Sequence, residues 1–171
     1  MMVRASAETY WEVYEFLMYE AQLLDEHRER EWLDTCCAED IIYLMPVRET
    51  RERGAGDGFS EDMYYFEEDR GSLELRVRRL ETEYAWAEDP PSRTRHFVTN
   101  VRVEPAEADE ELLVRSNLLL YRSQGTDRHY DTVSAERRDM LRREEEGLRL
   151  ARREILLDHT VLTTHNLSIF L

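Results

Sequence analysis

Apolar and polar side chains alternate along the last third of the chain and predict three consecutive β-strands. The strands cover Leu112–Ser123, His129–Arg142 and Leu148–Leu162. Short polar segments, each with one glycine, separate them, and strands joined in this way form hairpins. Because these strands exceed the usual length of about 5–6 residues, we expect a strongly bent and twisted meander.

The chain closes with an apolar segment, Asn166–Leu171. Terminal segments usually fray unless something ties them down. We therefore expect this tail to dock on the core of the chain itself or on a partner.

Helical patterns dominate the beginning of the chain. Ala7 to His27 is predicted to form an amphipathic helix capped by Ser6, because apolar residues recur at three- and four-residue steps. This apolar stripe consists of Tyr10, Val13, Leu17, Ala21 and Leu24. The acidic residues fall mostly outside it, namely Glu12, Glu15, Glu20 and Asp25. A second short helix is expected over Glu29–Cys36.

The middle of the chain mixes both patterns. Asp40–Val47 is an apolar run typical of a strand, and Arg48–Ser60 is expected to be a flexible, glycine-containing loop of unassigned role. Ser60–Asp62 resembles a helix start, and Ser72–Glu83 has the spacing of a helix. Thr94–Glu104 alternates like a strand, and its predicted apolar face consists of Phe97, Thr99, Val101 and Val103.

This order of elements contains no alternation of strands and helices of the kind that builds a parallel sheet. It predicts one α+β domain over residues 1–171, in which a curved, mostly antiparallel sheet packs on the N-terminal helices.

Charge and composition narrow the classes of partner. The formal net charge is −15, and residues 1–91 alone carry 24 acidic and 10 basic side chains. Such a chain repels phosphate, so we expect no nucleic-acid partner. No apolar run approaches the ~20 residues of a membrane span, and the first residues lack a signal-peptide pattern. The sequence therefore predicts a cytoplasmic protein without a membrane partner.

Two side-chain types limit the chemistry. The chain has 23 arginines and no lysine. This excludes a Schiff-base lysine or a P-loop lysine. The only cysteines, Cys36 and Cys37, are adjacent. They form neither a disulfide framework nor a zinc site.

One pair of residues could carry out acid–base catalysis. His129 and Asp131 lie two residues apart on a predicted strand, so they share a face, and Tyr43 or Tyr121 could polarise a carbonyl group beside them. The alternative is an ordinary cross-strand polar pair. A two-histidine, one-carboxylate iron site was also considered at Asp158, His159 and His165. Strand neighbours point to opposite faces, so we expect no metal site in this chain.

Arginines cluster after the Pro90–Pro91 break and along the hairpin of the last two strands. The set is Arg93, Arg95, Arg137, Arg138, Arg142, Arg152 and Arg153. The like charges of such a cluster repel one another unless acidic side chains, of this chain or of another, pair with them. We predict a protein interface at these arginines and at Phe170; an anion site is the alternative.

At this point the chain resembles the small (beta) subunits of aromatic ring-hydroxylating dioxygenases. The resemblance rests on ordered blocks that span nearly the whole chain: Tyr43–Arg48, Glu74–Leu80, Ala87–Arg95, Asn100–Val103, Val114–Asn117, Arg137–Arg143, Ala151–Asp158 and Asn166–Phe170. It implies a cone-shaped α+β fold shared with nuclear transport factor 2, scytalone dehydratase and ketosteroid isomerase.

The resemblance also implies a non-catalytic role and no cofactor in this chain. In that family the large (alpha) subunit holds the Rieske [2Fe–2S] cluster and the mononuclear Fe(II), and NADH supplies the electrons. The small subunit forms a trimer within an alpha3beta3 hexamer. Two adjacent cysteines agree with this role, because they cannot supply the ligands of a Rieske centre. The alternative function is a stand-alone isomerase or dehydratase of the same fold that uses His129 and Asp131.

Overall fold

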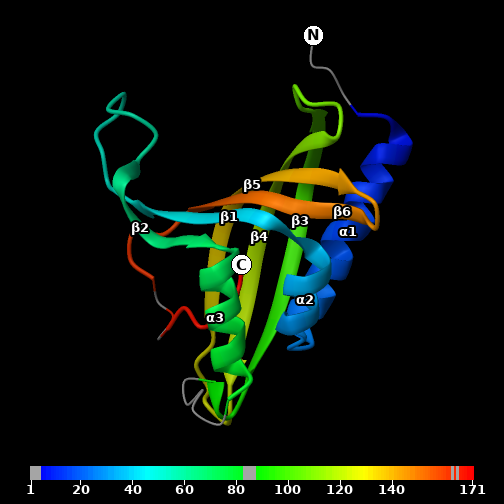
Figure 1. The fold of residues 1–171 in the computed structure, drawn as a ribbon. Coiled ribbons are helices and arrows are strands. Elements are labelled where there is room, and N and C mark those ends of the chain that lie inside the picture. The colour runs from blue at the N-terminus through cyan, green and yellow to red at the C-terminus, as the bar shows by residue number, and fades with distance from the viewer. Residues whose placement is uncertain (1–4, 83–87, 163, 165) are drawn as a thin grey trace.

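The computed structural model describes residues 5–82, 88–162, 164 and 166–171. Over these residues, six strands form one curved sheet and three helices lie against it (Figure 1). The helices are α1 (Ala7–Asp25), α2 (Glu29–Cys36) and α3 (Arg70–Leu80). The strands are β1 (Cys37–Arg48), β2 (Phe59–Asp69), β3 (Ser92–Pro105), β4 (Glu111–Gln124), β5 (Asp131–Glu144) and β6 (Gly147–Leu157). The predicted α+β fold is confirmed.

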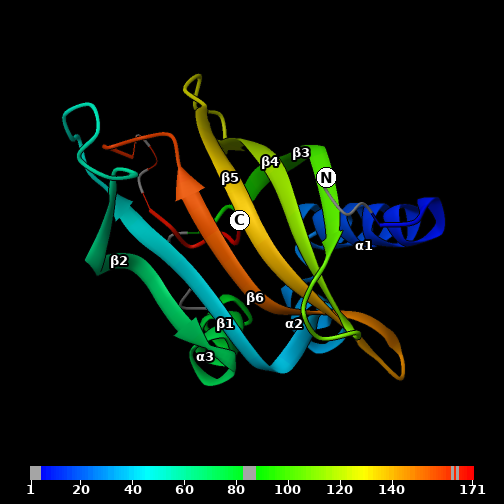
Figure 2. The ribbon, with the colours of Figure 1, turned by 90° about the horizontal axis from the view of Figure 1, so that it is seen from above.

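The sheet has the strand order β2-β1-β6-β5-β4-β3. Strands β3 to β6 are joined by successive antiparallel hairpins, as the alternating pattern predicts, and β1 pairs with β6 in the parallel direction. Figure 2 shows the strands curving together, with the C-terminal segment inside the curve. One face of the sheet is therefore concave and covered, whereas the opposite face, called the outer face below, is open.

The N-terminal helices follow the predicted bounds closely. The hydroxyl of Ser6 accepts the backbone N–H of Thr9 at 3.1 Å and caps α1. Val13, Leu17 and Leu24 of α1 are buried, as is Trp32 of α2. No helix of the described residues is long and apolar enough to cross a membrane.

The prediction of a helix that starts at Ser60 is wrong, because residues 59–69 form β2. The Ser60 hydroxyl does accept the backbone N–H groups of Asp62 and Met63, which imitates a helix cap. The aromatic residues that follow favour a strand, and they pair with β1. The true helix start is Asp69, whose carboxylate forms a capping box with Ser72. The predicted end of α3 at Glu83 lies outside the described residues.

The predicted apolar face of β3 is wrong in its first half. Phe97 is 54% exposed, whereas Thr94 and His96 are buried. The pairing with β4 shifts between Thr99 and Arg102, and Asn100 has a φ of 54°. A bulge inserts an extra residue and exchanges the two faces of a strand. Only Val103, after the bulge, is buried as the alternation predicts.

Both cysteines are buried and free. Burial raises the pKa of the Cys36 thiol to about 12 and that of Cys37 well above its usual value. Neither thiol is therefore a reactive nucleophile near neutral pH.

The tail docks on the core of its own chain. Phe170 is 2% exposed and its ring lies 4.6 Å from that of Trp32. The Tyr43 hydroxyl donates to the carbonyl of Leu171 and accepts its N–H, both at 2.9 Å. Arg76 donates to the carbonyls of Leu167 and Ile169 and lies over the Phe170 ring at 4.2 Å. The tail fills the concave side of the sheet.

The substitution Phe170→Ala should lower the free energy of unfolding by about 3–5 kcal/mol, because it opens a cavity beside Trp32. Urea unfolding followed by tryptophan fluorescence measures the loss. Phe97→Ala, at an exposed phenylalanine, is the control and should cost less than about 1 kcal/mol. Equal losses in the two variants would show that the tail contributes nothing special to stability.

Candidate protein interface

Strand alternation separates the predicted arginines into two groups. On β5 and β6 the inward positions carry Arg137 and Arg153, which are fully buried. The outward positions of β3, β5 and β6 carry the others, Arg93, Arg95, Arg138, Arg142 and Arg152, which remain partly or largely exposed. Phe170 belongs with the buried group. The cluster that the sequence presents as one set is therefore divided by the sheet itself.

Acidic side chains of this chain form ion pairs with the buried arginines. Arg153 donates to both carboxylate oxygens of Glu20 at 2.7 and 2.9 Å, and to both of Asp139 at 2.9 and 2.8 Å. Arg137 lies 3.5 Å from Glu20 and donates to the Ser116 hydroxyl at 3.3 Å. The indole N–H of Trp32 also donates to Glu20 at 3.1 Å. These contacts join α1, α2, β4, β5 and β6 in one buried network.

The network holds Glu20 in its charged form. Burial alone raises the pKa of this carboxyl, but Arg153 and Arg137 outweigh burial and lower the pKa to about 2. Burial lowers the pKa of Arg153, yet Asp139 and Glu20 raise it well above its usual value. Arg137 is less well matched: burial and the neighbouring Arg153 lower its pKa, and its Nη2 has no partner among the described residues.

Sequence reasoning missed Glu20, which it placed mostly outside the apolar stripe of α1. A signal was present, because Val13, Leu17, Glu20 and Leu24 follow steps of four, three and four residues. Glu20 therefore lies on the buried face of the helix, and its burial requires the two arginines. Asp25 is also buried, and its carboxylate lies 2.6 Å from His96 Nδ1.

The outward arginines are only partly neutralised. Arg142 pairs with Asp40 and Glu111, and Arg138 pairs with Glu136. Arg93 donates to the carbonyl of Gly125 at 2.7 Å. Arg95 lies 3.6 Å from Asp25, yet its side chain is largely exposed. Within the described part of the chain, Arg152 makes no hydrogen bond or ion pair.

Large apolar side chains lie between these arginines on the outer face. Phe97 of β3 pairs with Leu119 of β4, and Arg95 pairs with Tyr121, whose ring lies 5.3 Å from that of Tyr130. Leu119, Tyr121 and Tyr130 are 46%, 38% and 63% exposed. We call these four residues, Phe97, Leu119, Tyr121 and Tyr130, the outer patch. A contiguous exposed apolar surface rimmed by charge is typical of a protein interface.

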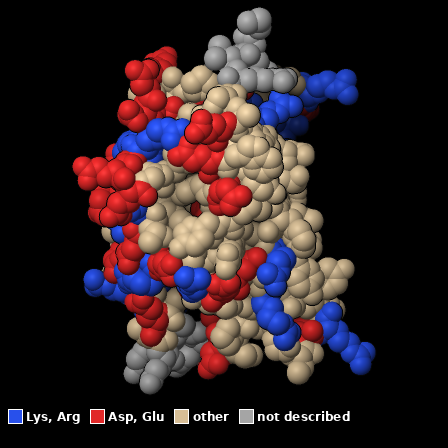
Figure 3. Space-filling model, turned by 90° about the vertical axis from the view of Figure 1, so that its right-hand side faces the viewer, with Lys and Arg blue, Asp and Glu red and all other residues tan. Residues whose placement is uncertain are grey.

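The charges elsewhere are distributed unevenly. In Figure 3, acidic side chains interspersed with basic ones crowd one half of the α1 side of the molecule, whereas the other half shows a broad uncharged area with basic side chains at its upper and lower ends.

The fold does not place Tyr43 or Tyr121 beside the predicted catalytic pair, His129 and Asp131. His129 and Asp131 line a cavity of only about 50 Å³ at the end of β4 and β5. The phenol of Tyr43 is buried and engaged by Leu171, and Tyr121 belongs to the outer patch. Neither Tyr43 nor Tyr121 therefore offers a hydrogen-bond donor to a substrate carbonyl beside His129 and Asp131.

The residues considered for iron have structural partners. The side chain of Asp158 accepts the Ser134 hydroxyl at 2.6 Å, and His159 Nε2 accepts the Ser134 N–H at 3.1 Å. His165 lies outside the described residues. Among the residues that are described, no group of three or more His, Cys, Asp or Glu side chains could hold a metal ion.

Comparison with known proteins identifies the relatives. The family model described as "Ring hydroxylating beta subunit" matches residues 19–164. The 3-phenylpropionate/cinnamic acid dioxygenase subunit beta of Photorhabdus laumondii is 41% identical, over 97% of this chain and 93% of its own length. The benzene 1,2-dioxygenase subunit beta of Pseudomonas putida is 39% identical, over 93% of this chain and 87% of its own length.

Solved structures agree with the sequence relatives. A chain of naphthalene 1,2-dioxygenase, solved with indole bound in its active site, superposes with a TM-score of 0.88 at 29% identity, covering 98% of this chain and 88% of that one. The beta subunit of benzoate 1,2-dioxygenase from Burkholderia mallei gives a TM-score of 0.68 at 26% identity, covering 92% and 93%. The fold is thus the nuclear transport factor 2-like fold of dioxygenase beta subunits, as the resemblance implies.

The pKa of Glu20 predicts how stability depends on pH. A carboxyl whose pKa falls from 4.5 to about 2 on folding contributes roughly 3 kcal/mol above pH ~4.5, and this contribution is lost as the pH falls toward 2. The variant Glu20→Gln should be less stable at pH 7, because Arg153 and Arg137 lose a buried partner. Between pH 5 and pH 3, its free energy of unfolding should fall by about 1–2 kcal/mol less than that of the wild type.

Urea unfolding at several pH values measures both effects, and Glu107→Gln, at an exposed acid, is the control. If the wild type and Glu20→Gln lose stability in parallel on acidification, Glu20 does not titrate with folding and the network is not held by its charge.

Proposed function

This chain belongs to the family of ring-hydroxylating beta subunits, and we propose that it is the non-catalytic structural subunit of an aromatic-ring dioxygenase. It supports the assembly of a larger catalytic subunit in the breakdown of aromatic compounds, and it acts as a single domain over residues 1–171.

The observation that carries this proposal is the outer patch. Phe97, Leu119 and Tyr121 lie exposed on strands whose opposite face is packed, and Tyr130 lies just before β5, so the sheet is rigid where it would meet a partner. Rigid aromatic anchors with arginines at their border are enriched in stable protein interfaces. We assign the outer patch and its arginines, Arg93, Arg95, Arg138, Arg142 and Arg152, to contacts within the assembly.

The interior supports the same proposal. Phe170 and Leu171 of the tail occupy the concave side of the sheet, where Tyr43 and Arg153 hold them. The buried charges are used to join secondary-structure elements, so they stabilise the scaffold. Arg137, Arg153 and Phe170 contribute to an interface indirectly, by fixing the strands that present it.

The proposed partner is the alpha subunit of the dioxygenase, in an alpha3beta3 hexamer whose beta chains also contact one another as a trimer. The Rieske [2Fe–2S] cluster and the mononuclear Fe(II) belong to that partner, and electrons reach them from NADH. A supply of NADH places the assembly in the cytoplasm. The names of the two curated relatives described above, both dioxygenase beta subunits, support this partner.

The substitution Leu119→Arg should prevent assembly and leave the fold intact, because it places a charge in the centre of the outer patch but not in the core. Native mass spectrometry after co-expression with the large subunit measures the complex. Wild type should give the hexamer, and the variant should give smaller species with an unchanged circular-dichroism spectrum.

The matched control is Leu75→Arg, which changes another exposed leucine, on α3 and outside the outer patch; Leu75 is 66% exposed and Leu119 46%. It should leave the hexamer unchanged. A hexamer that tolerates Leu119→Arg as well as Leu75→Arg would mean that the outer patch is not an assembly surface.

The stand-alone enzyme is tested by His129→Ala. In an assembled dioxygenase this variant should change turnover of an aromatic substrate by less than about twofold, because the exposed His129 touches no reacting group. Oxygen uptake with NADH and the purified electron-transfer proteins measures turnover. Loss of an isomerase or dehydratase activity of this chain alone in the same variant would instead favour the alternative function.

A further inference from the structure

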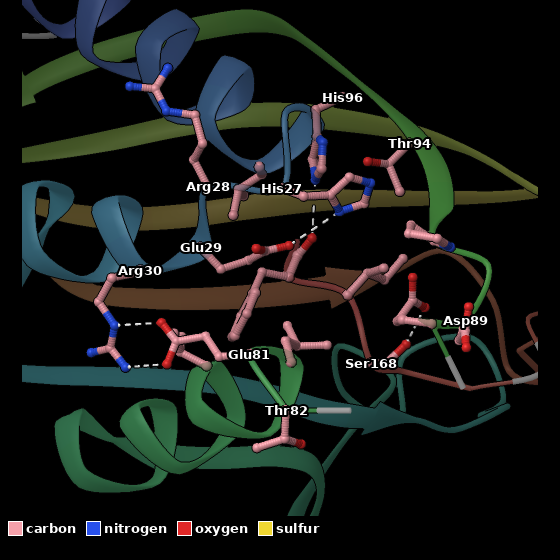
Figure 4. Close-up of a pocket in the computed structure, with 17 residues that line it drawn as sticks. His27, Arg28, Glu29, Arg30, Glu81, Thr82, Asp89, Thr94, His96 and Ser168 are labelled. Carbon is pink, nitrogen blue, oxygen red and sulfur yellow. Dashed lines mark hydrogen bonds and ion pairs between the residues drawn. The ribbon is translucent and has the colours of Figure 1, made fainter. Parts of the chain in front are cut away.

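A pocket lies away from the outer patch, where the ends of α1, α2 and α3 meet β3 and the tail. Its volume is about 440 Å³, and Figure 4 shows the side chains that line it. This volume lies in the range of about 300–1,000 Å³ that is typical of small-molecule sites. The function proposed above makes no use of it.

The pocket has an apolar lining along one part. These side chains come from α1, α3, the segment before β3, and the tail, and they are Leu24, Val77, Leu80, Pro91, Ile169 and Phe170. Leu24, Val77, Ile169 and Phe170 are fixed in the core, so this lining is preformed. It offers an apolar surface for one small ring.

The basic side chains around the pocket already have acidic partners. Arg30 pairs with Glu74 and Glu81, and Arg28 with Glu26 and Glu31. His96 lies 2.6 Å from Asp25, and its other ring nitrogen lies 3.0 Å from the carbonyl of Phe170. An anionic ligand would therefore have to compete for cations that are already neutralised.

The unused groups of the pocket are acceptors. Glu29, whose carboxylate lies beside His27 in Figure 4, has only that histidine as a side-chain partner among the described residues, at 3.3 Å. Asp89 makes no side-chain hydrogen bond or ion pair with the described residues. The Thr94 hydroxyl is buried and has no partner among those residues either. A buried hydroxyl without a partner is rare in folded proteins, so Thr94 points to a missing ligand group.

We propose that this pocket binds a small organic amine, in which an ammonium group is carried by a single apolar ring. An ammonium group has three donors and no acceptor, so each of these acceptors suits it: the carboxylate of Glu29, the lone pairs of the buried Thr94 hydroxyl and the exposed carboxylate of Asp89. The ring lies on the apolar lining beside Phe170 and Leu24. The pocket is thus a cation site of the subunit, separate from the surface assigned to assembly.

Three probes that share one ring test the charge requirement. Benzylamine, benzyl alcohol and benzoate are titrated into the full chain, and binding is followed by calorimetry and by the amide NMR signals of residues around the pocket. Benzylamine should bind, benzyl alcohol should bind about tenfold more weakly because it lacks the charge, and benzoate should not bind. Equal affinity for benzylamine and benzoate would overturn the proposal.

Two variants test the named residues. Glu29→Gln should weaken benzylamine binding by about tenfold or more, because a charge-assisted hydrogen bond is lost. Thr94→Val, which keeps the shape of the side chain, should weaken it by a smaller factor. Glu107→Gln, at an exposed acid of the loop between β3 and β4, is the control and should bind benzylamine like the wild type.

Thermal unfolding separates a binding role from a structural one. Thr94→Val should keep or raise the melting temperature, because its hydroxyl has no partner to lose, and Glu29→Gln should stay close to the wild type. The proposal fails if benzylamine does not bind at millimolar concentration, if Glu29→Gln binds it unchanged, or if Thr94→Val lowers the melting temperature. None of these results depends on whether the outer patch mediates assembly.

Discussion

The pairing of Arg153 with Glu20 and Asp139 is the constraint on which the other elements depend. A guanidinium group buried to this extent is tolerated only when carboxylates surround it, and here they come from α1 and β5 while the arginine comes from β6. The register of the hairpin and the rotation of α1 must therefore agree. The same guanidinium group donates to the carbonyl of Leu171, so the tail is positioned by the charges that position the helix.

The tail extends this arrangement along the concave side of the sheet. Its backbone carbonyls accept hydrogen bonds from arginines of three separate elements: Arg76 on α3, Arg122 on β4 and Arg153 on β6. Backbone groups in an irregular buried segment need such partners, because no strand ladder satisfies them. With the inner face filled in this way, exposed apolar side chains of β3 and β4, such as Phe97 and Leu119, lie on the outer face. The scaffold and the proposed surface for a partner thus lie on the two opposite faces of one sheet.

Local patterns in the sequence were sufficient to find α1, α2 and the three-strand meander of β4, β5 and β6, because the helical spacing and the alternation there largely agree with burial. They failed at β2, where Ser60 forms cap-like hydrogen bonds at the start of a strand. They failed again in β3, where a bulge near Asn100 exchanges the faces and leaves Phe97 outside. Both features depend on pairing with a neighbouring strand. Likewise, the seven predicted arginines could be sorted into buried and exposed groups only after strand parity and the position of Glu20 were known.

The exclusive use of arginine has a physical explanation in these contacts. Arg122 donates to Ser92, Thr164, Asn166 and Ser168 and pairs with Glu88, so one side chain connects β3, β4 and the tail. Arg153 serves two carboxylates and a carbonyl together. A guanidinium group has five donors in a fixed plane, whereas an ammonium group has three around one point. A lysine at either position would leave buried acceptors without partners. The arginines that join the core are therefore not interchangeable with lysine, even though the charge would be the same.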